Sequence, residues 1–203
     1  YINGALASGY TMKNRIINGN MAIDQRNAGA SVTANGYTLD RWKLYNTQSS
    51  KLTIQQNAGS VTPPVGFTKY LGMTSSSAYT VLSTDVFQIY QWIEGNNMAD
   101  LAWGTANAKT VTLSFWAYSS LTGTFGGALQ NGANTRSYPF SYTISSANTW
   151  TQISVTIPGD TTGTWTTDNT SGVAVIFCYG GGSIASGTAG AWVGSALSTV
   201  CLL

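Results

Sequence analysis

Hydrophobic and polar residues alternate along three stretches of the chain, residues 87–94, 111–118 and 150–157. In each stretch an apolar residue recurs at nearly every second position, as Ile89 and Ile93 do in the first. Alternation with a period of two is typical of a β-strand that buries one face and exposes the other. We therefore expect three half-buried strands at these positions.

Residues 173–179 are apolar throughout, so we expect a central strand that is covered on both faces. Four shorter stretches are further strand candidates: residues 15–17, 51–56, 79–82 and 137–144. Helical spacing of apolar residues is confined to residues 97–106, where it lasts one or two turns. Asn-Gly, Pro-Pro and Gly-Gly turn signals separate the candidate strands. Many short strands with regular turns predict an all-β fold, and we expect a jelly-roll β-sandwich.

A chain of 203 residues suits one sandwich domain, because such folds commonly reach this length as a single unit. We expect residues 1–13 to be an N-terminal arm or linker and residues 14–203 to be a single β-sandwich domain. No repeat of about 20–50 residues is evident, which argues against a propeller or a β-helix. No stretch is apolar for long enough to cross a bilayer, and the first residues do not resemble a signal peptide. We therefore expect no membrane insertion.

The composition argues against catalysis. The chain has no histidine, which is the side chain most often used for proton transfer near neutral pH, and it has only seven carboxylates. A glycosidase needs two carboxylates that face each other across a cleft, and nothing in the sequence selects such a pair. We expect a protein that is not an enzyme and that needs no cofactor. Seven tryptophans and eleven tyrosines favour binding or assembly instead.

Charge excludes one further class of partner. The nine basic residues are spread singly along the chain, so there is no basic run of the kind that nucleic-acid-binding proteins carry. Asp160, Asp168 and Asn169 could contribute oxygen ligands to a structural calcium ion, but they do not form an ordered acidic loop motif. We therefore predict neither a nucleic-acid partner nor a metal site.

Four aromatic residues lie on the polar sides of two predicted strands. Tyr90 and Trp92 belong to residues 87–94, and Trp116 and Tyr118 belong to residues 111–118. If the two strands are neighbours, the four rings line one face of a sheet. Flat rings can stack on the C–H faces of sugars, so the four residues are predicted glycan-binding residues. The alternative is that the rings pack beneath loops or against another subunit.

Three more residues are candidates for ligand contacts. Arg136 and Tyr138 follow the polar loop at residues 131–134, and arginine can bind an acidic sugar or a phosphate through two hydrogen bonds. A plain hairpin tip explains this cluster equally well. Trp165, in the loop at residues 159–170, is a candidate exposed anchor, as is Trp192.

Several segments carry a resemblance to a known family. The chain reads NRIINGNMAIDQRN from residue 14, YTLDRW from residue 37, LAWGTANAK from residue 101, LTGTFGG from residue 121 and IPGDTTGTW from residue 157. Together these segments resemble the carbohydrate-binding-module-like domains of tailed-phage tail-fibre and other virion structural proteins. The resemblance covers roughly residues 14–192. It implies a jelly-roll sandwich located on a virion, often within a trimeric fibre or spike, and it implies no catalytic residue.

The resemblance and the composition together predict a phage virion structural protein, as a tail-fibre, spike or decoration domain that binds host-surface polysaccharide. Two alternatives stay open. One is a capsid or tail component that only assembles with other virion proteins, and the other is a carbohydrate-binding module of a polysaccharide-degrading enzyme.

The C-terminal segment departs from the family pattern, because residues 195–203 do not resemble the further apolar strand of the relatives. Either residues 193–203 close the sandwich or a sheet edge stays open, and a neighbouring chain would cover such an edge. We therefore expect a homo-oligomer, a homotrimer, with residues 193–203 at or near the contact. We also expect Cys178 to be a buried free thiol, with a disulfide to Cys201 as the alternative.

Overall fold

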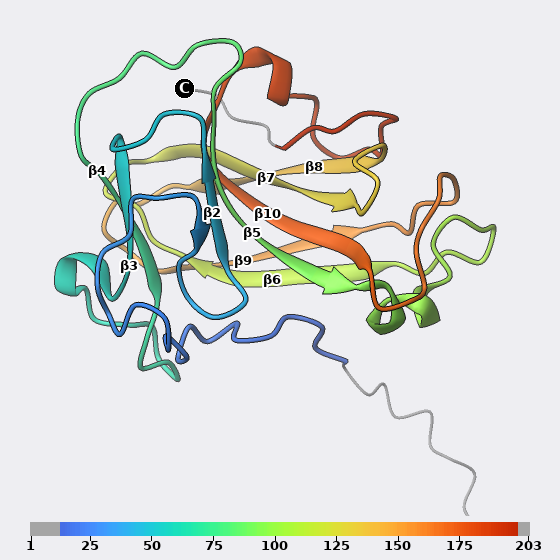
Figure 1. Cartoon of the computed structure of the whole chain (residues 1–203), viewed down its shortest axis with the longest axis horizontal. Coiled ribbons are helices and arrows are strands. Elements are labelled where there is room, and N and C mark those ends of the chain that lie inside the picture. Colours follow the sequence, from blue (N-terminus) through green and yellow to red (C-terminus); the bar gives the residue numbers. More distant parts are fainter. Residues whose placement is uncertain (1–12, 199–203) are drawn as a thin grey trace, which may run out of the picture.

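The protein is an all-β structure built from antiparallel sheets (Figure 1). The computed structural model describes residues 13–198. Within them the strands are β1 (Gly36–Tyr37), β2 (Lys43–Asn46), β3 (Leu52–Gln56), β4 (Leu71–Ser75), β5 (Val86–Glu94), β6 (Val111–Ala117), β7 (Gly123–Asn131), β8 (Ser137–Ile144), β9 (Thr151–Ile157) and β10 (Ser171–Gly181). Six of them form one sheet in the order β1-β2-β5-β10-β7-β8, while β3 pairs with β4 and β6 pairs with β9.

The second half of the chain pairs in a nested way. β7 and β8 form a hairpin, β6 and β9 pair outside it in the sequence, and β5 and β10 pair outside both. The innermost and outermost pairs join through β10 and β7 into the six-stranded sheet, whereas the middle pair forms a separate sheet. Successive pairs therefore alternate between two sheets.

Two apolar clusters hold the sheets together. The first contains Phe140 and Val175 of the six-stranded sheet, and half-buried Leu113, Phe115 and Val155 of β6 and β9 pack against it. The second joins strands β2 and β5 to the β3–β4 hairpin through buried Leu44, Ile89 and Ile54. Both small sheets thus cover the same face of the large sheet, which gives a β-sandwich-like arrangement.

The longer predicted strands are confirmed. In β5 every second residue is buried from Phe87 to Ile93, and in β6 and β9 the apolar positions are likewise more buried than the polar residues between them. β10 lies between β5 and β7, and its residues from Gly172 to Ile176 are all buried, as the continuous apolar run predicts. Residues 51–56 and 137–144 also form strands, β3 and β8.

Two of the short candidate strands are wrong, and side chains explain why. Residues 15–17 form no strand, because the backbone of Ile17 bonds the side-chain amide of Gln91 in both directions, at 2.8 Å each. Residues 79–82 form no strand, because buried Asp85 accepts hydrogen bonds from the Tyr79 hydroxyl and the Leu82 N–H. A side chain replaces the partner strand in both places.

The predicted helical stretch at residues 97–106 is reduced to short 3₁₀ turns. These are η2 (Gly95–Asn97) and η3 (Ala99–Leu101), and a left-handed Ala102 ends the second turn. Two further 3₁₀ turns are η1 (Ala58–Ser60) and η4 (Ser183–Ala185). No helix in the described part of the chain is long and apolar enough to cross a membrane.

The described C-terminal residues run along the outer edge of β8. Val193 and Ser137 exchange two backbone hydrogen bonds, at 2.9 and 3.1 Å, in an isolated β-bridge. The Ser137 hydroxyl then donates to the carbonyl of Ser195 and accepts from the N–H of Leu197. Residues 199–203, which include Cys201, lie outside the described residues. Of the predicted contact segment, residues 193–203, only residues 193–198 are therefore described. Cys178 is buried in β10.

Candidate functional site

The structure separates the two pairs of predicted rings. Tyr90 and Trp92 lie on β5 of the six-stranded sheet, whereas Trp116 lies on β6, which pairs with β9 alone, and Tyr118 follows directly after it. The predicted four-ring face therefore does not form. The reason is the nested pairing, which places β5 and β6 in different sheets although they are consecutive in the sequence.

Tyr90 and Trp92 instead belong to a surface built from three neighbouring strands, β1, β2 and β5. Residues directly opposite each other in antiparallel strands point to the same face of the sheet. Tyr37 lies opposite Lys43, Lys43 lies opposite Tyr90, and Tyr45 lies opposite Gln88. These residues therefore share the outer face, away from the core residues Leu44 and Ile89. We call this surface the tyrosine face, and it consists of Tyr37, Lys43, Tyr45, Gln88, Tyr90 and Trp92.

The rings of the tyrosine face are open to solvent to different degrees. Tyr37 and Tyr45 are 42% and 43% exposed, while Tyr90 and Trp92 are half-buried. The Tyr90 and Trp92 rings meet edge to face with centroids 6.4 Å apart. Gln88 lies between them and Tyr45, and its Oε1 atom is buried without a hydrogen-bond partner among the described residues. The exposed part of the face is thus flat aromatic surface, and the Gln88 acceptor is not accessible to solvent.

Two cations stand beside this face. The Arg26 guanidinium lies 4.7 Å from the centre of the Tyr37 ring, and the Lys43 ammonium lies 4.6 Å from the same centre. Arg26 belongs to a turn in which the Asp24 carboxylate accepts hydrogen bonds from the N–H groups of Asn27 and Gly29. The turn therefore fixes the position from which Arg26 reaches the ring.

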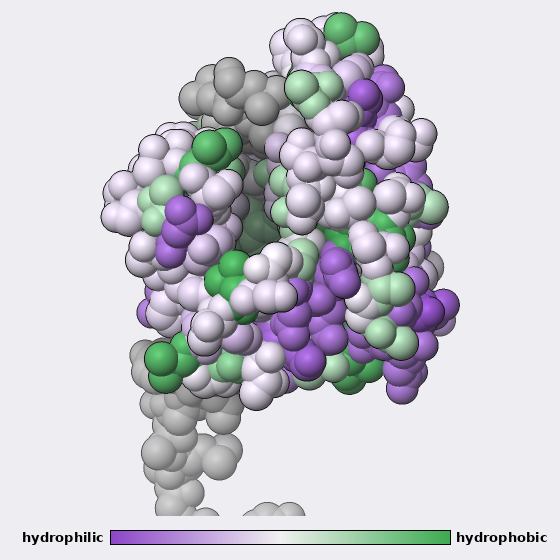
Figure 2. All heavy atoms as spheres, turned by 90° about the vertical axis from the view of Figure 1, so that its left-hand side faces the viewer, coloured by the Kyte–Doolittle hydropathy of each residue, from purple (hydrophilic) through white to green (hydrophobic). Residues whose placement is uncertain are grey.

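Trp116 lines a separate groove with a volume of about 80 Å³. The Trp150 ring forms part of its wall and is held by a hydrogen bond from its Nε1 to the carbonyl of Thr62, at 2.8 Å. Phe67 and Lys69 also line the groove, and Tyr118 packs against Trp150 from outside it with ring centroids 5.3 Å apart. Figure 2 looks from the side of the molecule on which β3 and β4 lie, and shows a surface made mostly of residues of intermediate hydropathy.

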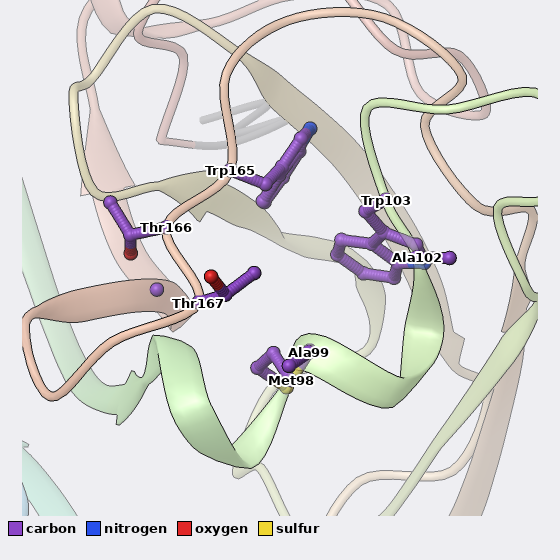
Figure 3. Close-up of a pocket in the computed structure, with 8 residues that line it drawn as sticks. Met98, Ala99, Ala102, Trp103, Trp165, Thr166 and Thr167 are labelled. Atoms are coloured by element: carbon purple, nitrogen blue, oxygen red, sulfur yellow. The ribbon is translucent and has the colours of Figure 1, made fainter.

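Trp165 is not the exposed anchor that its loop position predicts. Its ring packs edge to face against Trp103 and Trp192, with centroids 4.9 and 5.3 Å apart. Figure 3 shows Trp103 and Trp165 above Met98, around a hollow of about 20 Å³. A space of that size holds about one water molecule, so this cluster is part of the packing at the end of the sandwich rather than a ligand pocket.

Arg136 and Tyr138 are also used internally. Two nitrogens of Arg136 donate to the two carboxylate oxygens of Asp160, at 2.6 and 2.8 Å, and Asp160 is only 2% exposed. Tyr138 is buried beside Trp192, and its burial raises the pKa of its hydroxyl. The preceding turn is organised by fully buried Asn131, whose Oδ1 accepts from the N–H groups of Thr135 and Arg136. The hairpin-tip alternative therefore describes this cluster.

Each of the seven carboxylates accepts a hydrogen bond from a neighbouring residue. A hydrogen bond from the Leu82 N–H, and weaker contributions from Tyr79, Gln48 and Thr47, lower the pKa of Asp85 to about 2. Burial of the carboxylate opposes this shift. Arg15 lowers the pKa of Asp100, and the Thr170 hydroxyl and N–H lower that of Asp168. Burial opposes the ionisation of Glu94 and Asp160, yet Arg41 and Arg136 keep both pKa values below their ordinary range. Asp24 and Asp40 accept from backbone N–H groups.

The carboxylate oxygens of Asp160 and Asp168, which were considered above as calcium ligands, accept hydrogen bonds from neighbouring protein groups instead. Both Asp160 oxygens accept from Arg136, and one of them also accepts from the N–H and the hydroxyl of Thr162. Asp168 holds its own turn through Thr170. Among residues 13–198 no three acidic or cysteine side chains gather in a way that could hold a metal ion.

The comparisons with known proteins add no assignment: no family model matches the chain, and neither a curated protein nor a solved structure does.

Sequence reasoning missed several residues of these surfaces. Tyr37, Lys43 and Tyr45 lie on β1 and β2, two strands of two and four residues that are too short to show a clear pattern. Lys43 and Tyr45 do alternate with buried Leu44 and Asn46, and that alternation is the signal that could have found them. Arg26 carries no such signal, because its place beside Tyr37 depends on the turn that Asp24 holds.

Proposed function

We propose that this chain is a carbohydrate-binding domain of a phage virion structural protein, and that its tyrosine face binds host-surface glycans. The observation that carries the proposal is the gathering of Tyr37, Tyr45, Tyr90 and Trp92 on one outer sheet face. Soluble domains rarely keep so many large rings together on a sheet surface without a partner.

The chemistry of this face suits a sugar chain. The C–H faces of a pyranose are apolar and flat, so they can lie on exposed tyrosine and tryptophan rings. Sugar hydroxyls can exchange hydrogen bonds with the Tyr37 and Tyr45 hydroxyls. Tyr and Trp also lose little side-chain entropy on binding, because they have two rotatable side-chain bonds.

The strand order supports the finer fold assignment within this proposal. In a jelly roll, a long folded-back chain rolls up so that successive strand pairs alternate between two sheets. The β5–β10, β6–β9 and β7–β8 pairs follow that arrangement. The resemblance of residues 14–27 and 157–165 to tail-fibre modules supports a virion location, with other virion proteins and further copies of the chain as partners.

A binding role without catalysis is part of the proposal. A glycosidase needs one carboxylic acid whose pKa is raised so that it can donate a proton. The five carboxylates with shifted pKa values are all shifted downward. They hold loops and cations in place, so we assign them to the structure of the domain.

The test is a glycan array followed by titration of the glycans that bind. We expect Tyr90→Ala and Trp92→Ala each to weaken binding by about tenfold or more, because each change removes ring area worth on the order of 1–3 kcal/mol. Trp116→Ala is the matched control, since Trp116 lies on the other sheet. If all three variants lose glycan affinity equally, or if none does, the tyrosine face is not the binding site. Unchanged binding with altered oligomer mass would favour the assembly-only alternative.

A further inference from the structure

Two basic residues, Lys43 on the tyrosine face and Arg26 beside it, form no ion pair among the described residues. Four other basic residues contact carboxylates within 4.0 Å: Lys13 and Arg15 contact Asp100, Arg41 contacts Glu94, and Arg136 contacts Asp160. Arg26 and Lys43 take part in no ion pair among the described residues, and both lie beside the ring of Tyr37 instead. Their charges therefore remain available to a ligand.

The nearest acidic residues in the sequence are occupied elsewhere. Both Asp24 oxygens accept from backbone N–H groups of their own turn, at 3.1 and 2.6 Å. Asp40 accepts from the N–H of Gln25, at 2.7 Å. These bonds brace the segment that carries Arg26, so the acids fix the place of the cation without pairing with it.

The geometry points to an anionic group of a glycan bound between Arg26 and Lys43. Each cation lies within 5 Å of the centre of the Tyr37 ring, so both positive charges attract an anion at the edge of that ring. Lys43 is also directly opposite Tyr90 in the sheet, which joins the anion position to the half-buried rings. A sugar that rests on Tyr90 thus has its neighbouring unit beside the two cations.

We propose that the protein prefers acidic glycans, with a uronic acid or another carboxylate-bearing sugar at the Arg26–Lys43 position. This inference rests on the proposed function, and it adds the chemical class of the ligand. The guanidinium of Arg26 can bind a carboxylate through two parallel hydrogen bonds, and the Lys43 ammonium adds a point charge. At the other end of the face, Glu94 is paired with Arg41 at 2.7 Å, so its charge repels an acidic ligand only weakly.

The probes are oligogalacturonate and its carboxyl-reduced form, which has the same length and no charge. We expect wild-type protein to bind oligogalacturonate more tightly, by about tenfold, and to lose this preference at high salt because exposed charges are screened. The double variant Arg26→Gln/Lys43→Gln should bind both probes alike. Lys109→Gln is the control, since it removes one exposed charge away from this face. Thermal unfolding shows whether each variant is folded.

The outcomes separate the two proposals. If wild-type protein binds both probes equally and the double variant changes nothing, the preference for acidic glycans is wrong while the proposed function stands. If Tyr90→Ala leaves the binding of both probes intact, the tyrosine face is not the site and both proposals fail. Loss of the acidic preference in Lys109→Gln as well would show that net charge, not this pair of cations, attracts the ligand.

Discussion

Arg136 provides the sharpest test of whether a polar residue was correctly assigned to the structure rather than to a ligand. Its guanidinium forms two hydrogen bonds to Asp160, and its side chain is only 17% exposed. The same contact raises the pKa of Arg136 and, together with Thr162, lowers that of Asp160. Asp160 in turn holds Thr162, whose carbonyl accepts from the Trp165 indole at 3.0 Å. The pair therefore anchors the loop that carries Trp165.

We predict that Arg136→Gln destabilises the protein by about 3 kcal/mol, because removing one partner of a buried ion pair leaves the other charge uncompensated at a cost of about 3–5 kcal/mol. The lower end applies because Arg136 keeps some contact with water. The double variant Arg136→Gln/Asp160→Asn should be less destabilised than the two single changes combined, with a coupling of about 1–3 kcal/mol.

Urea denaturation followed by circular dichroism measures both effects, with Lys109→Gln as a surface control that should stay within about 0.5 kcal/mol of wild type. Glycan binding by folded Arg136→Gln protein should be unchanged. A stability loss below about 1 kcal/mol together with lost binding would refute the structural assignment, since exposed ion pairs have that size and a ligand contact would then explain the residue.

Three further predictions concern acidity, catalysis and assembly. Because the folded-state pKa of Asp85 lies near 2, below its ordinary value of 3.8, its ionised form stabilises the protein above that ordinary value. We expect this contribution to disappear as the pH falls from about 3.8 through about 2. Denaturation curves of Asp85→Asn should lack that part of the acid dependence. If the variant and wild type lose stability with acid in the same way, Asp85 does not stabilise the fold through its ionised form. Incubation with oligogalacturonate should release no new reducing ends, and release that one Asp→Asn change abolishes would overturn the prediction of a non-enzyme. Light scattering over a concentration series should give the mass of a homo-oligomer, a trimer, and a stable monomer for both the full chain and a chain ending at Gly194 would disprove it.

The fold class could be predicted because its signal is local. Alternation in β5, β6 and β9 and the continuous apolar run of β10 depend only on which face of each strand is buried, and both patterns survive in the structure. Strand partners carry no such signal. β5 pairs with β10 across about eighty residues, and neither strand's sequence indicates which strand it pairs with. The sequence therefore left open whether β5 and β6 are neighbours, and the structure places them in different sheets.

The candidate site could be predicted only where its signal is local. Tyr90 and Trp92 could be placed on the outer side of β5 from alternation alone. Arg136 looked like a ligand residue because its partner, Asp160, lies in a distant loop. Trp165 looked exposed because the two tryptophans that cover it come from other segments. Whether a polar or aromatic loop residue has a structural role depends on its long-range partners, and only the folded chain brings these partners together.

The most direct test of the account is a map of backbone amide shifts by nuclear magnetic resonance, recorded with and without oligogalacturonate. We predict shifts concentrated at Arg26 and along β1, β2 and β5, around Tyr37, Lys43 and Tyr90. Shifts gathered around Trp116 and Trp150 would move the site to the groove on the other sheet. If neither oligogalacturonate nor its neutral form shifts these amides, the tyrosine face does not bind glycans and the central claim is contradicted.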